Sequence, residues 1–136
     1  MKKILIGYDG TESAWRALER GADIRVAGDQ VGVIAVVAVA TSGARTVAPS
    51  GAGEAPAEHR IALEDACAWL AERGITAEAI TAVGDPGTAI CEVAERDGYD
   101  TIIVGSRNLR GMKRLLLGSV SDRVAHHAPC DVLIAK

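Results

Sequence analysis

The sequence predicts an α/β protein, a single doubly wound sandwich in which helices cover both faces of a five-stranded parallel sheet. Short apolar runs typical of strands alternate with stretches of helical periodicity from one end of the chain to the other. Val31 to Val39 is almost continuously apolar and rich in β-branched residues, which indicates a strand buried on both faces. A chain of 136 residues fits one domain, and we expect that domain to span residues 1–136.

The apolar runs place the five strands. They predict strands at residues 3–8, 31–39, 75–83, 101–104 and 131–136. Right-handed crossovers between parallel strands then favour the sheet order 3-2-1-4-5, with ligands expected at the carboxyl ends of the strands where the order reverses.

Helical spacing of apolar residues fills the gaps between these strands. It predicts four helices, whose buried faces include the pairs Ala14 and Leu18, Leu63 and Leu70, Ile90 and Val93, and Val120 and Val124. Asp85 followed by Pro86 is a typical start for the third helix. Ser119 with Asp122 three residues later predicts an N-cap at Ser119 for the fourth.

The composition excludes several classes of partner. A net charge of -3 and 3% aromatic residues disfavour nucleic-acid binding, which uses basic surfaces and aromatic stacking platforms. No apolar run reaches the length of a membrane span, and no signal peptide is recognisable, so we expect a cytoplasmic protein. Cys67, Cys91 and Cys130 are widely separated, which favours free thiols over a disulfide or metal framework.

The segment from Gly105 to Ser119 is the most informative part of the chain. It follows a buried strand, precedes a helix and carries four basic residues, which are Arg107, Arg110, Lys113 and Arg114. A strand, a glycine-bearing loop and a helix start together present backbone N–H groups and a helix dipole to an anion, usually phosphate. Neither the P-loop nor the dinucleotide glycine pattern fits the chain.

Asp9 follows the first predicted strand, as Gly105 follows the fourth. If these strands are neighbours, both residues face one crevice, where Asp9 could hold ribose hydroxyls or a divalent ion. A turn or capping role for Asp9 is the alternative. The low-complexity stretch from Thr41 to Ala57 lies on the same edge and is either a surface loop or a flap over a ligand. His126 and His127 are adjacent on a helix and point about 100° apart, so we expect no catalytic pair.

The combined motifs closely resemble the universal stress protein family. They are Gly105-Ser106-Arg107-Asn108 with Gly118-Ser119-Val120 nine residues later, the opening Ile4 to Ser13, Gly84-Asp85-Pro86, and His127 to Ile134. Nucleotide-binding members carry Gly-x2-Gly-x9-Gly-Ser/Thr at this place. The resemblance implies a homodimer, in a family that has both ATP-binding members and members that bind no nucleotide; under the ATP-binding interpretation the cofactor is ATP, with or without Mg²⁺ or Mn²⁺.

By this resemblance Gly105, Gly118 and Ser119 contact phosphates, Asp9 lies near the ribose and phosphates, and Val39 (or Val37) meets adenine through its backbone. The same comparison adds to the site Gly7, Tyr8, Arg107, Asn108, Val120 and Ser121. A divalent ion would reach Asp9 only indirectly, through the phosphates. The second copy of the chain would pair along the last strand, residues 131–136, because an open edge strand exposes unpaired backbone groups. An unidentified regulatory protein is the other expected partner.

One residue departs from the family pattern, because Asn108 replaces the second motif glycine. Asn tolerates left-handed backbone conformations, but its side chain obstructs a close approach of phosphate. Three functions therefore stay open: an ATP-binding stress or regulatory protein, a nucleotide-free dimeric interaction protein, or a weak ATPase. No catalytic residue is predicted, since no base stands beside the anion donors in any known motif.

Overall fold

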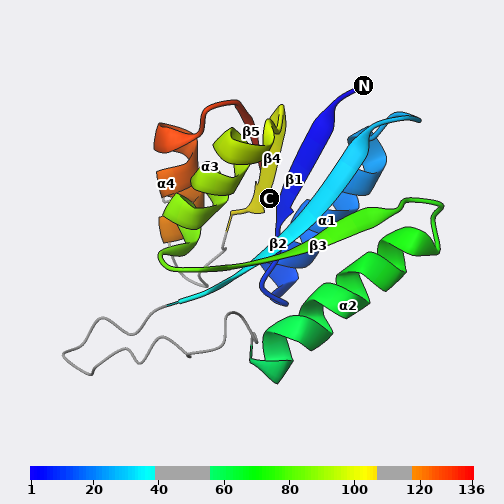
Figure 1. The fold of residues 1–136 in the computed structure, drawn as a ribbon, viewed down its shortest axis with the longest axis horizontal. Helices are drawn as coiled ribbons and strands as arrows, with labels where there is room; N and C mark the ends of the chain where they lie inside the picture. Colours follow the sequence, from blue (N-terminus) through cyan, green and yellow to red (C-terminus); the bar gives the residue numbers. More distant parts are fainter. Residues whose placement is uncertain (39–55, 107–117) are drawn as a thin grey trace.

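The computed structural model describes residues 1–38, 56–106 and 118–136. Its elements alternate as predicted (Figure 1): β1 (Lys3–Gly7), α1 (Glu12–Ile24), β2 (Gln30–Val37), α2 (Ala57–Ala71), β3 (Ala77–Val83), α3 (Pro86–Asp97), β4 (Thr101–Gly105), α4 (Ser119–His127) and β5 (Asp131–Ala135). All strand pairs are parallel and the sheet order is β3-β2-β1-β4-β5, which confirms the predicted topology.

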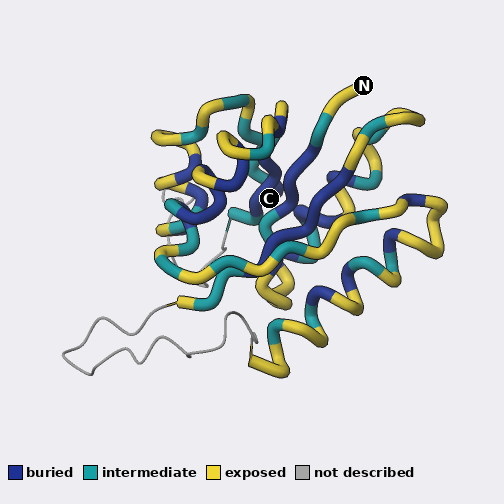
Figure 2. The backbone as a smooth tube through the Cα atoms, viewed as in Figure 1, coloured by how far each residue is buried: buried dark blue, intermediate teal, exposed yellow. Residues whose placement is uncertain are grey.

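Two hydrophobic cores lie on the two faces of the sheet. Ile4 and Ile6 of β1 pack with α1 and α2 on one face, whereas Leu5 between them packs with α3 and α4 on the other. Side chains of a strand alternate between faces, so a strand covered on both sides needs an uninterrupted apolar run. Figure 2 shows the consequence, because β1 and β2 are buried along most of their length while each helix buries one stripe.

The central strands bring distant segments of the chain together at the carboxyl ends of the strands. β1 pairs with β2 on one side and with β4 on the other, so the carboxyl ends of these three strands are neighbours. The order reverses at β1, which is the switch point where open α/β sheets bind ligands. The fold therefore places Asp9, just after β1, beside the end of β4.

β5 forms one edge of the sheet and pairs only with β4 within the described residues. Its position at the edge is as predicted. No helix within residues 1–38, 56–106 or 118–136 has the length and apolarity that spanning a bilayer requires. All three cysteines are free thiols, of which Cys91 is buried and Cys67 and Cys130 are half-buried.

Candidate functional site at the switch point

A cavity of about 470 Å³ opens at the carboxyl ends of β1, β2 and β4. Its walls come from these strand ends and from the first turns of α1, α2, α3 and α4. Asp9 and Gly105 both line it, as expected of residues that follow neighbouring strands. The lining is mostly apolar on the β2 side, where it includes Ile34, Val36 and Val37.

Most of the predicted site residues meet in this cavity. Those that line it are Gly7, Tyr8, Asp9, Gly105, Gly118, Val120 and Ser121. Ser119 does not; its exposed side chain lines a neighbouring surface pocket instead. Val39, Arg107 and Asn108 lie outside the described residues, as do most of the stretch from Thr41 to Ala57 and the other three basic loop residues.

Asp9 organises the turn between β1 and α1. Its Oδ1 accepts hydrogen bonds from the backbone N–H of Thr11 at 3.0 Å and from the Thr11 hydroxyl at 2.6 Å. The Thr11 hydroxyl oxygen in turn accepts from the backbone N–H of Ala14 at 3.2 Å and caps α1. Asp9 therefore has the turn role that the sequence left open, and it holds this role while exposed at the cavity wall.

Gly105 has a packing reason to be glycine. A Cβ placed there would lie only 2.5 Å from the carbonyl carbon of Ser13 and closer still to the carbonyl oxygen and Oγ of the same residue. All three separations are shorter than van der Waals contact allows, so the first turn of α1 rests directly on the end of β4. Any role of Gly105 in ligand binding comes in addition to this close approach of two backbones.

The start of α4 corrects the predicted N-cap. Gly118, not Ser119, is the N-cap residue, and Ser119 is the first residue of the helix. Gly118 has no side chain with which to cap, and its extended backbone already directs its carbonyl to the N–H of Asp122 at 2.8 Å. The buried Ser121 hydroxyl donates to the same carbonyl at 3.0 Å. Among the residues that the structure describes, no side-chain hydrogen bond caps the start of α4.

Tyr8 lines the cavity and belongs to the hydrophobic core on the α1 and α2 face of the sheet. Its ring packs edge-on against Trp15 with centroids 6.3 Å apart, and the residue is buried. Burial, with smaller contributions from the negative charges of Asp65 and Asp9, raises the pKa of the Tyr8 phenol. Tyr8 therefore stays neutral at physiological pH and offers the site a rigid aromatic wall.

Sequence reasoning missed the lining residues that other elements supply. Thr11, Pro56, His59, Pro86 and Ile90 come from the first turns of α1, α2 and α3. Pro56, His59 and Ile90 belong to no short motif, and the packing of the helices on the sheet brings them to the cavity. Thr11 and Pro86 lie in the stretches Ile4 to Ser13 and Gly84-Asp85-Pro86 that carry the family resemblance, but neither is among the predicted site residues.

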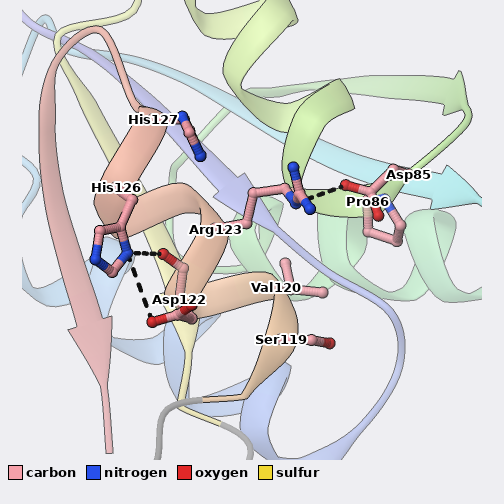
Figure 3. A pocket seen from close by; sticks show the side chains of 9 residues that line it. Asp85, Pro86, Ser119, Val120, Asp122, Arg123, His126 and His127 are labelled. Atoms are coloured by element: carbon pink, nitrogen blue, oxygen red, sulfur yellow. Dashed lines mark hydrogen bonds and ion pairs between the residues drawn. The ribbon is translucent and has the colours of Figure 1, made fainter.

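The neighbouring pocket lies between the starts of α3 and α4 (Figure 3). Pro86 and Val120 line both this pocket and the switch-point cavity. Asp85 Oδ2 accepts from the N–H of Thr88 at 3.0 Å and pairs with Arg123 Nε at 3.3 Å. His126 Nδ1 lies 2.8 Å from the Asp122 carbonyl oxygen, and Figure 3 shows the His127 ring on another side of the helix.

No group of three or more His, Cys, Asp or Glu side chains in the described part of the chain is arranged to hold a metal ion. The two exposed histidines of α4 do not face each other, in agreement with the expected divergence of adjacent helical residues.

Comparison with known proteins agrees with this geometry. The model of the universal stress protein family matches residues 1–136. The chain belongs to this family. A curated member, universal stress protein YxiE of Bacillus subtilis, is 32% identical over 148 aligned residues that cover 98% of each chain.

Solved structures of universal stress proteins share the fold. One, a universal stress protein in complex with cAMP, is 28% identical, with a TM-score of 0.76 and coverage of 99% of this chain and 97% of that one. Another, from Arabidopsis thaliana with AMP bound, is 22% identical, with a TM-score of 0.75 and coverage of 100% and 92%. The second supports the fold alone. The first is a family member that binds an adenine nucleotide.

Proposed function

We propose that this chain is an ATP-binding stress or regulatory protein, one domain over residues 1–136, that holds the nucleotide in the switch-point cavity. One observation carries the proposal: two features occur at the same place. The cavity lies where the order of the strands in the sheet reverses, and α4 begins there with no side-chain cap among the described residues. A helix start whose N–H groups lack internal partners is an anion site.

The phosphates belong at the α4 end of the cavity. Gly118, Val120 and Ser121 line it there, and the helix dipole adds a partial positive charge. Because the Ser121 hydroxyl is engaged with the Gly118 carbonyl, the backbone N–H groups are the donors that face an incoming phosphate. The basic residue Arg107 and the motif residue Asn108 belong to the same proposal, although they lie outside the described residues.

The nucleoside belongs at the β2 end. Ile34, Val36 and Val37 give this end an apolar lining that suits a purine ring. The Val37 carbonyl accepts from the Gly84 N–H at 2.9 Å and keeps a second lone pair, so the backbone contact to adenine would come from Val39 or Val37. Asp9, between the two ends, offers carboxylate oxygens to ribose hydroxyls.

A divalent ion, Mg²⁺ or Mn²⁺, would arrive with the nucleotide. The described residues hold no three-ligand cluster for a resident metal, and one carboxylate near phosphates is the usual protein contribution to a Mg²⁺–nucleotide complex. Asp9 would act on such an ion indirectly. The cAMP complex of a 28% identical family member supports an adenine nucleotide as the ligand.

The experiment is a calorimetric titration of the protein with ATP and with adenosine, compared with Ser119→Asp and Ser119→Asn. Ser119 is exposed at the first position of α4, so both variants should fold. The added carboxylate should weaken ATP binding by about tenfold or more through like-charge repulsion, while the isosteric amide changes it little. Adenosine, which lacks phosphate, should bind equally to all three.

Asn108→Gly separates the proposal from its alternative, a nucleotide-free interaction protein. Binding by the wild type supports the proposal directly. If only the glycine variant binds ATP, the Asn108 side chain blocks the site in this protein and the alternative holds. If neither binds, nucleotide binding is wrong for this chain.

We also propose a cytoplasmic homodimer that pairs along β5. This strand lies at the sheet edge, and its outer backbone groups have no strand partner among the described residues. A second copy would satisfy them and create a symmetric interface. Sedimentation velocity at micromolar concentration should give a dimer, and a monomer throughout that range contradicts this part of the proposal.

A further inference from the structure

His59 is a cavity residue that no motif of the sequence indicated. It is the third residue of α2, and its backbone N–H bonds to the Pro56 carbonyl at 2.9 Å, so its position is set by the first turn of the helix. Its half-buried side chain lines the switch-point cavity with Tyr8 and Asp9.

The His59 ring has an unusual polar environment. Its Nδ1 is buried and has no hydrogen-bond partner among the described residues. Buried polar atoms without partners are rare in folded proteins, and an unpaired donor is costlier than an unpaired acceptor. A proton on Nδ1 would create such a donor. We therefore assign the ring proton to Nε2, which makes that nitrogen a hydrogen-bond donor.

The sheet order tells which end of a nucleotide His59 would meet. α2 packs on β2 and β3, whereas the anion-binding start of α4 follows β4 on the other side of β1. His59 therefore stands across the cavity from the phosphate end. Of the β2 residues in the lining, Val37 belongs to the α2 side, because it alternates with Val36 and shares a face with Val33 and Ala35, and its apolar side chain suits a base.

His59 at this end and Asp9 between the two ends have complementary hydrogen-bonding abilities. The Asp9 carboxylate only accepts hydrogen bonds, which matches the ribose hydroxyls, whereas Nε2–H of His59 only donates. Adenine offers its ring nitrogens N1, N3 and N7 as acceptors. We propose that His59 recognises the purine base by donating Nε2–H to one of these ring nitrogens, a role that rests on the nucleotide site proposed above.

The first test uses three substitutions at His59 and ATP as the probe. The amide nitrogen of Gln reaches the place of Nε2, and that of Asn reaches only the place of Nδ1. His59→Ala and His59→Asn should weaken ATP binding about three- to tenfold, the value of one neutral hydrogen bond. His59→Gln should stay within about twofold of the wild type. Unfolding midpoints of all variants control for damage to the first turn of α2.

The second test locates the acceptor. Among 1-deaza-, 3-deaza- and 7-deaza-ATP, one analogue should bind the wild type more weakly than ATP by the same factor as His59→Ala costs. That analogue should bind His59→Ala and the wild type equally, because the bond can be lost only once. Inorganic triphosphate, which lacks the base, should bind both proteins equally.

These outcomes distinguish the failure of this inference from failure of the nucleotide site itself. If the wild type binds ATP but His59→Ala binds it equally well, or if no deaza analogue is weakened, the role of His59 is wrong and the site stands. Equal losses in His59→Gln and His59→Asn also overturn it, since the ring would then act through packing alone. A wild type that binds no ATP refutes the site.

Discussion

The starts of α3 and α4 differ in how their first backbone N–H groups are capped. Each helix follows a parallel strand and leaves its first N–H groups without intrahelical partners. α3 supplies its own anion, because the Asp85 carboxylate accepts from the N–H and the hydroxyl of Thr88 at 3.0 and 2.9 Å. α4 begins after Gly118, its N-cap residue, and has no side-chain cap from residues 1–38, 56–106 or 118–136.

This difference is the reason why the proposed phosphate site lies at the start of α4 and not at the start of α3. At α3 an external anion would meet the fixed charge of Asp85, itself paired with Arg123. At α4 the residues Gly118, Val120 and Ser121 line the switch-point cavity, whereas Asp122, the acidic residue of the first turn, lines the neighbouring pocket instead. The uncapped start costs α4 some stability, which a bound phosphate would return.

The glycines at the ends of the two preceding strands give the largest expected effect. In Gly105→Ala the new Cβ would overlap the backbone of Ser13, with the carbonyl carbon only 2.5 Å away, so α1 must move off β4. We expect a loss of about 3 kcal/mol in the free energy of unfolding. Gly84, which leads into α3, has φ +135° and no atom within 4 Å of the position that a Cβ would take, so Gly84→Ala should cost only backbone strain, about 1–2 kcal/mol. Urea denaturation measures both.

Ser13→Ala provides the control for Gly105→Ala. It removes the Ser13 hydroxyl, which would also overlap the new Cβ, but leaves the backbone atoms in place. The double variant should therefore remain as unstable as Gly105→Ala alone. Rescue by Ser13→Ala would mean that the side chain, not the backbone, requires glycine at residue 105.

Local patterns in the sequence were sufficient for the elements of the sheet but not for its exact ends. The run from Val31 to Val39 predicted a strand that continues past Val37, whereas β2 begins one residue earlier, at Gln30, and ends where its pairing with β3 ends, at Val37 opposite Val83; Val39 lies outside the described residues. The length of a neighbouring strand is not a local property. The predicted strand at 75–83 likewise begins only at Ala77, because Ile75 belongs to the turn after α2.

Some residues of the candidate site could likewise be predicted from local sequence patterns, and others could not. Asp9 and Gly105 could be predicted because each directly follows a strand, and parallel strand ends meet at one edge. The N-cap was placed one residue late, since the Ser119 pattern is a common signature and only the backbone direction at Gly118 decides against it. His59 could not be predicted, because its place depends on how α2 packs over β2.

The cap of α3 offers the next effect, of intermediate size. Asp85→Ala removes the acceptor for the Thr88 N–H and hydroxyl and the partner of Arg123, and it should lower the free energy of unfolding by about 1 kcal/mol. ATP binding should be unchanged, because Asp85 does not line the switch-point cavity. Weaker ATP binding in this variant would mean that the start of α3 also affects nucleotide binding, which would contradict the assignment of the phosphate site to α4 alone.

The negative charge of Asp85 by itself should have the smallest effect on the free energy of unfolding, and the pH dependence of unfolding separates this effect from the loss of the cap. The backbone N–H of Thr88, then its hydroxyl and then Arg123, hold the pKa of the Asp85 carboxyl below its ordinary value of 3.8. A lowered pKa in the folded state means that the charge stabilises the fold above pH 3.8 and that this contribution is lost as the pH falls through the folded value.

Asp85→Asn keeps an oxygen acceptor for Thr88 but carries no charge, so its difference from the wild type measures the charge itself. Because Asp85 is exposed to solvent, we expect roughly 0.5 kcal/mol near neutral pH. The difference should be constant down to about pH 4 and then shrink as the wild-type carboxylate is protonated. Urea unfolding of both proteins between about pH 2 and 7 provides the measurement. A difference that persists unchanged at the lowest pH would show that the amide is simply a poorer cap, and that the charge of Asp85 contributes nothing to the start of α3.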